Sequence, residues 1–228
     1  MHFQKVYTQK QVKAYFKPSV LSQVREFFLY LLKVFLIISF IYLTIRFNLF
    51  DRVDISGKSM YPTYNEADNP NKEIGKNDTI LIDILTPKFG SYQRGDVVVM
   101  RSPTFDKTGE LYIKRVIALP EETVIFDNGK VFVQNIDNPK STRLDEASYL
   151  KGEVATYKGI ERGKIVENKL QRDEYYLMGD NRGGSSDSRV FGAVKKTQIL
   201  GKEFYRMTPS VKSGWFNLPK YNIGNTNQ

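Results

Sequence analysis

The sequence predicts a mainly β protein, in which an antiparallel β-sheet domain follows one transmembrane helix. Two observations carry this prediction. Residues 27–45 are apolar apart from Lys33, and about 20 apolar residues cross a bilayer core as a helix. After residue 50 the chain has short β-branched and aromatic runs between turns rich in Gly, Pro and Asn, and no long helical period, which is typical of β structure.

The apolar segment is predicted to be an uncleaved signal anchor at residues 27–46. A cleaved signal peptide has a shorter apolar region and small residues at its cleavage site, whereas bulky residues follow here. A buried core helix has a polar stripe, which this segment lacks. Lys33 lies near enough to one end to reach the headgroups. The basic residues 1–26 are predicted to stay in the cytoplasm, by the positive-inside rule, at a cell membrane that the chain crosses once.

An extracytoplasmic domain is predicted for residues 47–206. Its clearest element is a hairpin at 123–133, where Asn128-Gly129 supplies the positive φ angles of a type I′ turn. Residues 135–172 are polar and weakly patterned, which predicts an excursion inserted into this domain. The other predicted strands are 53–55, 79–85, 96–100, 111–118 and 175–178.

The C-terminal tail, residues 207–228, has few residues suited to packing. Trp215, Phe216 and Leu218 are the exceptions, and they are predicted to lie in the core. The alternative is contact with the bilayer surface, where aromatic side chains are favoured.

Composition excludes several kinds of catalytic centre. The chain has 228 residues, no Cys and a single His at position 2, so a Ser-His-Asp triad, a Cys-His pair, a Cys-rich zinc site and disulfides are unsupported. No metal or cofactor is predicted. Residues 1–33 carry +5 of the net charge of +9, and no basic stripe interleaved with aromatics follows them. Nucleic-acid binding is therefore not expected.

Ser59 lies in a segment that can present its hydroxyl. Gly57 permits close backbone approach, and Pro62 disfavours α geometry at the residue before it. Taken alone, however, a Ser in such a loop is usually a simple turn residue.

Lys114 is a candidate general base. On the predicted strand 111–118 it shares one face with Tyr112 and Val116. Burial lowers the pKa of a Lys from about 10.4, enough to leave a neutral amine that takes a proton from a Ser. Arg115 cannot do so, because a guanidinium keeps its proton. The alternative is a Lys whose ammonium reaches water along the sheet.

A third segment, residues 179–189, follows a predicted strand and is crowded with hydroxyls, glycines and alternating charges. It is either a surface turn or a support for a buried amine, with Asp/Arg pairs fixing the loop.

Together these segments resemble the bacterial type I signal peptidases, the Ser-Lys leader peptidases. The resemblance runs from the anchor to residue 206, and the compact excursion is closer to Gram-positive members. It rests on residues 59–63 (Ser-Met-Tyr-Pro-Thr), 94–98 (Arg-Gly-Asp-Val-Val), 112–120 (Tyr-Ile-Lys-Arg-Val-Ile-Ala-Leu-Pro) and 179–189 (Gly-Asp-Asn-Arg-Gly-Gly-Ser-Ser-Asp-Ser-Arg).

This resemblance implies a catalytic domain of the signal-peptidase type. It implies a membrane-anchored serine endopeptidase that removes signal peptides from secreted preproteins after small residues at −1 and −3. Ser59 would be the nucleophile and Lys114 the general base, through an acyl-enzyme. The implied partners are signal peptides and the lipid bilayer, and the protein would be a monomer without a cofactor.

The resemblance also implies supporting roles. Ser185 falls where a hydroxyl orients the Lys amine, Asp187 with Arg189 falls where a charge pair stiffens the site, and Asp180 is a further supporting residue. The backbone N–H of Ser59 would donate to the oxyanion. Some members have a second donor, a Ser, where this chain has Gly57, so a backbone group or water replaces that donor, or the hole is weaker. The implied oxyanion and substrate-binding residues are Gly57, Ser59, Met60 and Pro62.

Two other functions are alternatives. A self-cleaving repressor shares the Ser-Lys chemistry but needs an N-terminal DNA-binding helix pair, and residues 1–50 hold the apolar span instead. A non-catalytic membrane-anchored β-domain, acting as a binding or scaffold protein, belongs to a different class. A non-catalytic protein of this kind would be indicated by the loss of Ser59 or Lys114, and both residues are present.

Overall fold

The structure is a computed structural model, and it describes residues 19–65, 77–102, 110–135, 139–150, 166–207, 214–219 and 221. The chain divides into two compact units, residues 1–47 and residues 48–228.

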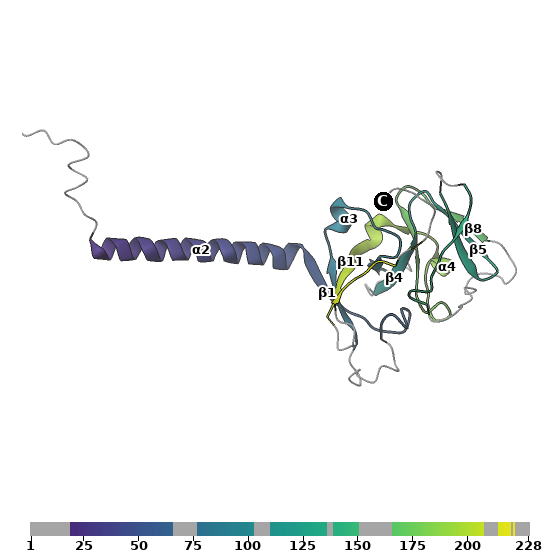
Figure 1. The fold of residues 1–228 in the computed structure, drawn as a ribbon, viewed down its shortest axis with the longest axis horizontal. Helices are drawn as coiled ribbons and strands as arrows, with labels where there is room; N and C mark the ends of the chain where they lie inside the picture. The colour runs from purple at the N-terminus through teal and green to yellow at the C-terminus, as the bar shows by residue number, and fades with distance from the viewer. Residues whose placement is uncertain are drawn as a thin grey trace, which may run out of the picture. The chain divides into compact units, whose positions relative to one another are not determined.

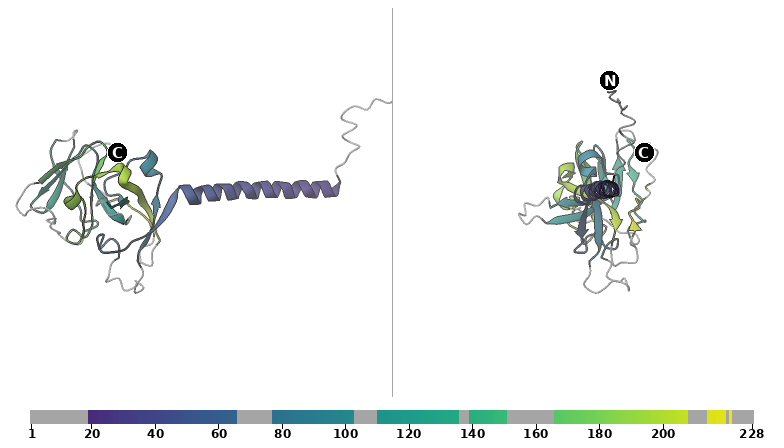
Figure 2. Two further views of the ribbon diagram at one scale, coloured as in Figure 1. Left: turned by 180° about the vertical axis from the view of Figure 1, so that it is seen from behind. Right: turned by 90° about the vertical axis from the view of Figure 1, so that its left-hand side faces the viewer.

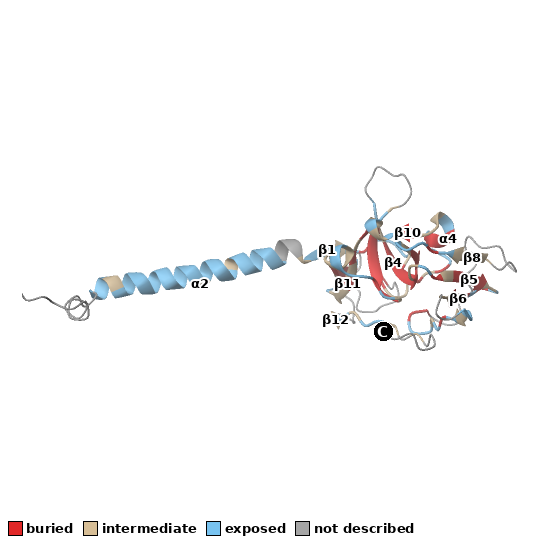
Figure 3. Ribbon diagram, turned by 90° about the horizontal axis from the view of Figure 1, so that it is seen from above, coloured by how far each residue is buried: buried red, intermediate tan, exposed pale blue. Residues whose placement is uncertain are grey.

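Helix α2 (Val20–Asn48) dominates the first unit (Figure 1). Its part Val20–Ile45 is long and apolar enough to cross a membrane, and none of its most apolar stretch is buried inside the protein. Figure 3 shows this helix almost entirely in the colour of exposed residues. The predicted helix is therefore present, and it begins before residue 27.

The second unit is built from two antiparallel sheets (Figures 1 and 2). The larger has the order β1-β2-β11-β3-β4-β9-β10, with β12 beside β11, and the smaller has the order β7-β6-β5-β8. The mainly β, antiparallel fold class is thus confirmed. The strands of the larger sheet are β1 (Phe50–Asp54), β2 (Thr79–Asp83), β3 (Val97–Arg101), β4 (Leu111–Ala118), β9 (Glu174–Met178), β10 (Val194–Lys195), β11 (Ile199–Arg206) and β12 (Gly214–Trp215). Those of the smaller sheet are β5 (Thr123–Asp127), β6 (Lys130–Gln134), β7 (Thr142–Arg143) and β8 (Val166–Lys169). Short helical turns are α3 (Thr86–Phe89), α4 (Ser188–Phe191) and η1 (Lys196–Gln198).

Strand β4 has the predicted bounds, and the predicted hairpin is β5 and β6, with positive φ at Asn128 and Gly129. Strand β2 ends at Asp83, two residues before its predicted end at residue 85. The Asp83 carboxylate accepts hydrogen bonds from the backbone N–H groups of Leu85 and Thr86, which turns the chain into α3.

Strand β11 was not predicted, although it lies inside the larger sheet between β2 and β3. Gly201, Lys202 and Glu203 interrupt its apolar pattern. Gly201 is needed where the strands approach closely, because a Cβ there would lie 2.7 Å from the backbone oxygen of Asp83. Tertiary packing therefore decides this strand, not the local pattern.

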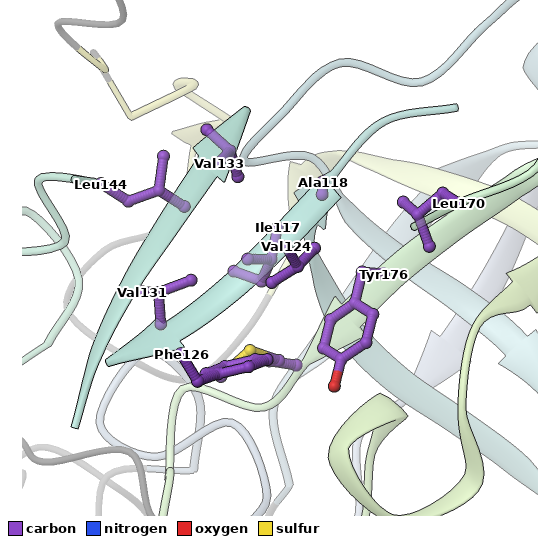
Figure 4. Packing of buried hydrophobic residues seen from close by; sticks show 10 residues of the cluster. Ile117, Ala118, Val124, Phe126, Val131, Val133, Leu144, Leu170 and Tyr176 are labelled. Atoms are coloured by element: carbon purple, nitrogen blue, oxygen red, sulfur yellow. The ribbon is translucent and has the colours of Figure 1, made fainter. Parts of the chain in front are cut away.

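Buried apolar side chains form three clusters. One lies between β5, β6 and the adjoining ends of β4 and β9 and includes Phe126 and Tyr176 (Figure 4). Both sheets contribute residues to this cluster. The predicted excursion contributes β7 and β8 to the smaller sheet. A second cluster contains Ile55, Met60 and Tyr64, on the segment that carries Ser59. A third fills the face of the larger sheet that includes Val116.

The tail differs from its prediction. Trp215 is 71% exposed, so its predicted place in the core is wrong. It lies on the two-residue strand β12, where its ring contacts the rings of Phe204 and Tyr205 on the neighbouring strand β11. Leu218 is 40% exposed, whereas Phe216 packs against the cluster that contains Met60.

Candidate active site

The segment around Ser59 is a tight turn anchored in the core. Ile55 donates its backbone N–H to Asp78, and Met60 is buried to 1% exposure beneath the turn. Gly57 has a φ of +80°, a value that an L side chain rarely adopts. This backbone holds Ser59 at the surface of the turn, where its side chain is half-buried.

Lys114 is placed by the register of the larger sheet. It sits on β4 opposite Val98 of β3, and only 3% of its surface is exposed. Its Nζ lies 3.0 Å from Ser59 Oγ and donates to the backbone oxygen of Ile113 at 2.8 Å. The ring centroid of Tyr112 is 5.1 Å from the same nitrogen. The fold thus brings together a hydroxyl and an amine that are 55 residues apart in the chain.

The loop after β9 holds the Ser59 turn from the other side. The Asn181 backbone N–H donates to the Ser59 carbonyl at 3.0 Å, and the Asn181 side chain donates to the Lys58 carbonyl at 3.1 Å. A Cβ at Gly179 would lie 2.4 Å from the Ser59 carbonyl oxygen and 2.2 Å from Ser185 Oγ. Only glycine therefore permits this approach.

Asp187 and Arg189 form a fully buried ion pair within this loop. Arg189 Nε and Nη2 donate to the two carboxylate oxygens at 2.8 and 2.6 Å, and the Gly179 N–H donates to Asp187 at 3.0 Å. Burial alone would raise the pKa of the Asp187 carboxyl, but the hydrogen bonds and charge of Arg189 outweigh burial, and the pKa lies below its ordinary value. The carboxylate is therefore ionised at neutral pH and caps α4.

Ser185 is completely buried between these groups. Its Oγ lies near the Asp187 carboxylate and helps to lower the pKa of that carboxyl, but it forms no well-aligned hydrogen bond among the residues that the structure describes. The contact to the Lys114 amine that the resemblance implies is thus not formed in this arrangement, and the role of Ser185 stays a prediction.

Asp180 belongs to a hydrogen-bond network that joins three segments of the site. Arg115 Nε and Nη2 donate to its two oxygens at 2.9 and 2.6 Å, and the Thr63 hydroxyl donates to the same carboxylate. Arg115 Nη1 donates to the Gly95 carbonyl at 2.9 Å. The Ser59 turn, β4 and the loop after β9 therefore share one buried carboxylate.

Sequence reasoning missed Thr63, Arg115 and Asn181 as members of this site. Arg115 was excluded as a base but not recognised as a structural partner. A signal was available, since an Arg on a strand predicted to be buried requires an acidic partner. The hydrogen bond from the Asn181 backbone N–H to the Ser59 carbonyl could not be predicted, because a pattern of side chains does not indicate backbone contacts.

The remaining predicted residues line the Ser59 turn. Pro62 follows a cis peptide bond from Tyr61. Gly57 supplies no side-chain donor, and a Cβ added there would meet open space, so no described neighbour fills the position. Within the described ranges no group of three or more His, Cys, Asp and Glu side chains is arranged to hold a metal ion.

The family model described as "Signal peptidase, peptidase S26" matches residues 28–208. The chain belongs to this family. The peptidase is 29% identical over 178 residues to signal peptidase IB of Staphylococcus aureus strain MRSA252, covering 76% of this chain and 82% of that protein. It is 28% identical over 158 residues to the probable signal peptidase I-1 of Synechocystis sp., covering 67% of this chain and 74% of that protein.

Among solved structures, a signal peptidase I from Enterococcus faecalis V583 is 25% identical to the peptidase, covers 49% of this chain and 96% of that chain, and superimposes with a TM-score of 0.36. Family membership makes the chain a bacterial type I signal peptidase, an enzyme that removes signal peptides. The apolar helix α2 agrees with association with a membrane.

Proposed function

We propose that the chain cleaves signal peptides with a Ser-Lys dyad, Ser59 acting as nucleophile and Lys114 as general base. The observation that carries this proposal is the 3.0 Å separation of Lys114 Nζ and Ser59 Oγ, with the lysine almost fully buried. A nucleophile within hydrogen-bond distance of a base is the arrangement that covalent catalysis requires.

In the proposed reaction, Ser59 Oγ attacks the scissile carbonyl carbon while its proton passes to the neutral Lys114 amine. When the C–N bond breaks, Lys114 delivers this proton to the departing amine, and an ester joins the signal peptide to Ser59. A water molecule then loses a proton to Lys114 and attacks the ester, which restores the Ser59 hydroxyl. The hydrogen bond to the Ile113 carbonyl aims the amine, because it fixes one of its N–H bonds.

The Ser59 backbone N–H is the proposed oxyanion donor. Its position is set by the hydrogen bond from Asn181 to the Ser59 carbonyl and by the close contact at Gly179. Gly57 adds no side-chain donor, and the space beside it is open. Water is therefore the proposed second donor, and Met60 and Pro62 are proposed to shape the adjoining substrate site.

The N-terminal half of β4 is the proposed edge for substrate pairing. Strand β9 pairs with β4 only from Arg115 onward, so within the described strands Leu111 to Lys114 pair with β3 alone. A signal peptide extended along this edge gains backbone hydrogen bonds, and shallow pockets at alternate residues admit the small side chains at −1 and −3.

The proposed topology places residues 1–26 in the cytoplasm, α2 across the membrane and the catalytic domain outside it, as a monomer with no role in binding nucleic acid. The concentration of positive charge before the apolar segment supports this orientation. Because β1 begins at Phe50, two residues after α2 ends, the anchor tethers the catalytic domain close to the membrane that also holds the substrate.

A preprotein cleavage assay tests the function directly. The full chain in detergent micelles is expected to cut a preprotein once, after the alanine at −1, and mass spectrometry of the released peptide identifies the bond. Changing that alanine to phenylalanine is expected to lower kcat/KM by about a hundredfold or more, because a bulky side chain does not fit a shallow pocket. Equal cleavage of both substrates, or cleavage elsewhere in the chain, would count against the proposal.

Activity is also expected to fall steeply as the pH is lowered from 9 to 6. The mechanism needs an unprotonated Lys114 amine, and protonation removes the base. The Asp187–Arg189 pair does not contribute to this loss. Because Arg189 holds the pKa of the Asp187 carboxyl below its ordinary value, the ionised form, and the stability that it brings, are lost only at pH values well below this range. A flat profile of kcat/KM over this range would contradict a neutral-lysine mechanism.

A further inference from the structure

The C-terminal residues 214–219 and 221, named here the C-terminal strap, lie beyond the part of the chain that matches the family model. They begin with β12, which pairs with the end of β11 at Tyr205 and Arg206. Although part of the strap is exposed, three of its residues, Phe216, Pro219 and Tyr221, contact groups that are packed against or hydrogen-bonded to the elements carrying the proposed dyad.

The first contact is at Phe216. Its backbone N–H donates to the Phe204 carbonyl of β11 at 3.0 Å. Its ring packs against the cluster that contains Ile55, Met60 and Tyr64. Because Met60 directly follows Ser59, Phe216 adds to the cluster in which the turn that carries the serine hydroxyl is anchored.

The second contact is at Gly95, next to β3. A Cβ there would lie 2.7 Å from Pro219 Cδ and 3.0 Å from Tyr221 Cε2, so the strap rests directly on this backbone. The Gly95 carbonyl accepts the hydrogen bond from Arg115, and the Gly95 N–H donates to the Val116 carbonyl at 2.8 Å. Both partners lie on β4, one and two residues after Lys114.

The third contact joins the strap to the buried charge network. The Tyr221 and Tyr149 rings meet edge to face with centroids 6.4 Å apart, and the Arg115 guanidinium lies 4.2 Å from the Tyr149 ring. Burial raises the pKa of Tyr221 to about 12, so its hydroxyl is neutral throughout the range in which the enzyme is assayed. This packing therefore does not change with pH.

We propose that the C-terminal strap sets the distance between Ser59 and Lys114, with Phe216 and Tyr221 as positioning residues. Phe216 supports the Ser59 turn, while Pro219 and Tyr221 support the backbone beside Lys114. The proposal rests on the proposed Ser-Lys function. It assigns the strap a positioning role and no contact with substrate.

The test compares full-length variants in detergent micelles. Tyr221→Ala and Phe216→Ala are each expected to lower kcat about tenfold, because small misplacements of reacting groups are costly, with KM within about twofold of wild type. Tyr221→Phe keeps the ring and is expected to retain at least about half of the wild-type kcat. Asn217→Ala, an exposed neighbour on the same strap, is the matched control and is expected to match wild type.

Every assay is run well below the melting temperature of the variant, measured by circular dichroism, and pH profiles are recorded for each. An unchanged kcat in Tyr221→Ala overturns the proposal, as does a change confined to KM. If Tyr221→Ala does not fold, the milder Tyr221→Leu is judged by the same criteria. The Ser59→Ala variant distinguishes the two proposals. If Ser59→Ala still cleaves the substrate, the proposed dyad is wrong. If Ser59→Ala is inactive and Tyr221→Ala is fully active, only the strap proposal is wrong.

Discussion

Replacing Ser59 or Lys114 by alanine is expected to lower kcat/KM for a signal-peptide substrate by about four orders of magnitude or more, because members of a catalytic unit act together. In the proposed dyad the two side chains, which lie 3.0 Å apart, act as one unit, so that neither is expected to work without the other. The double variant is therefore expected to be no worse than either single variant. Initial rates of preprotein cleavage by purified protein provide the measurement.

Lys114→Arg sharpens this prediction. Arginine keeps the positive charge and much of the length, but its guanidinium does not release a proton near neutral pH, so it cannot act as a base. The variant is expected to be as inactive as Lys114→Ala. Lys130→Arg, the same exchange at an exposed position on β6, is the matched control and is expected to keep full activity. Measurable turnover in Lys114→Arg would require a different base.

The local sequence pattern was sufficient to predict the strands in which apolar and polar residues alternate regularly. Strand β4 and the β5–β6 hairpin follow directly from alternation and an Asn-Gly turn. Strand β11 was missed because the burial of Glu203 depends on a distant partner: it accepts a hydrogen bond from the Tyr64 hydroxyl, 139 residues earlier, and it also pairs with Arg206, three residues further along the strand. Burial raises the pKa of the Glu203 carboxyl, while Arg206 opposes the shift. A charged residue in a strand can thus lie inside when the fold supplies its partner.

In the site too, the residues that belong to local motifs were predicted, whereas the long-range contacts were not. Ser59, Lys114, Asp187 and Arg189 were singled out from motifs, and the fold places each pair in contact. Those motifs do not indicate that Asp180 pairs with an arginine 65 residues earlier. Long-range polar contacts of this kind depend on strand register, which is fixed by the whole sheet.

Asp180→Asn is expected to destabilise the protein by about 3–5 kcal/mol, which is the cost of leaving a buried charge without its partner. Both side chains of the Arg115–Asp180 pair are at most 2% exposed. Burial alone lowers the pKa of the Arg115 guanidinium, but the charge and hydrogen bonds of Asp180 outweigh it and raise the pKa. The melting temperature is expected to fall by roughly 10 °C.

Glu121→Gln provides the control for this prediction. It makes the same acid-to-amide change in the Arg172–Glu121 pair, whose side chains are 91% and 49% exposed. Stability should stay within about 0.5 kcal/mol of wild type, since exposed ion pairs contribute little. If Asp180→Asn melted no lower than Glu121→Gln, the buried pair would not be a structural contact.

Replacing both Arg115 and Asp180 distinguishes the contribution of this buried pair to the stability of the protein from its role in positioning the site. In Arg115→Met with Asp180→Leu, no charge is left unpaired, so much of the lost stability is expected to return. The Thr63 hydroxyl nevertheless loses its acceptor, and the Gly95 carbonyl loses its donor. The double variant is therefore expected to melt near the wild-type temperature but to remain about tenfold or more below it in kcat, because the Ser59 turn and β4 no longer share a fixed partner. Full recovery of both properties would mean that the pair only stabilises the fold.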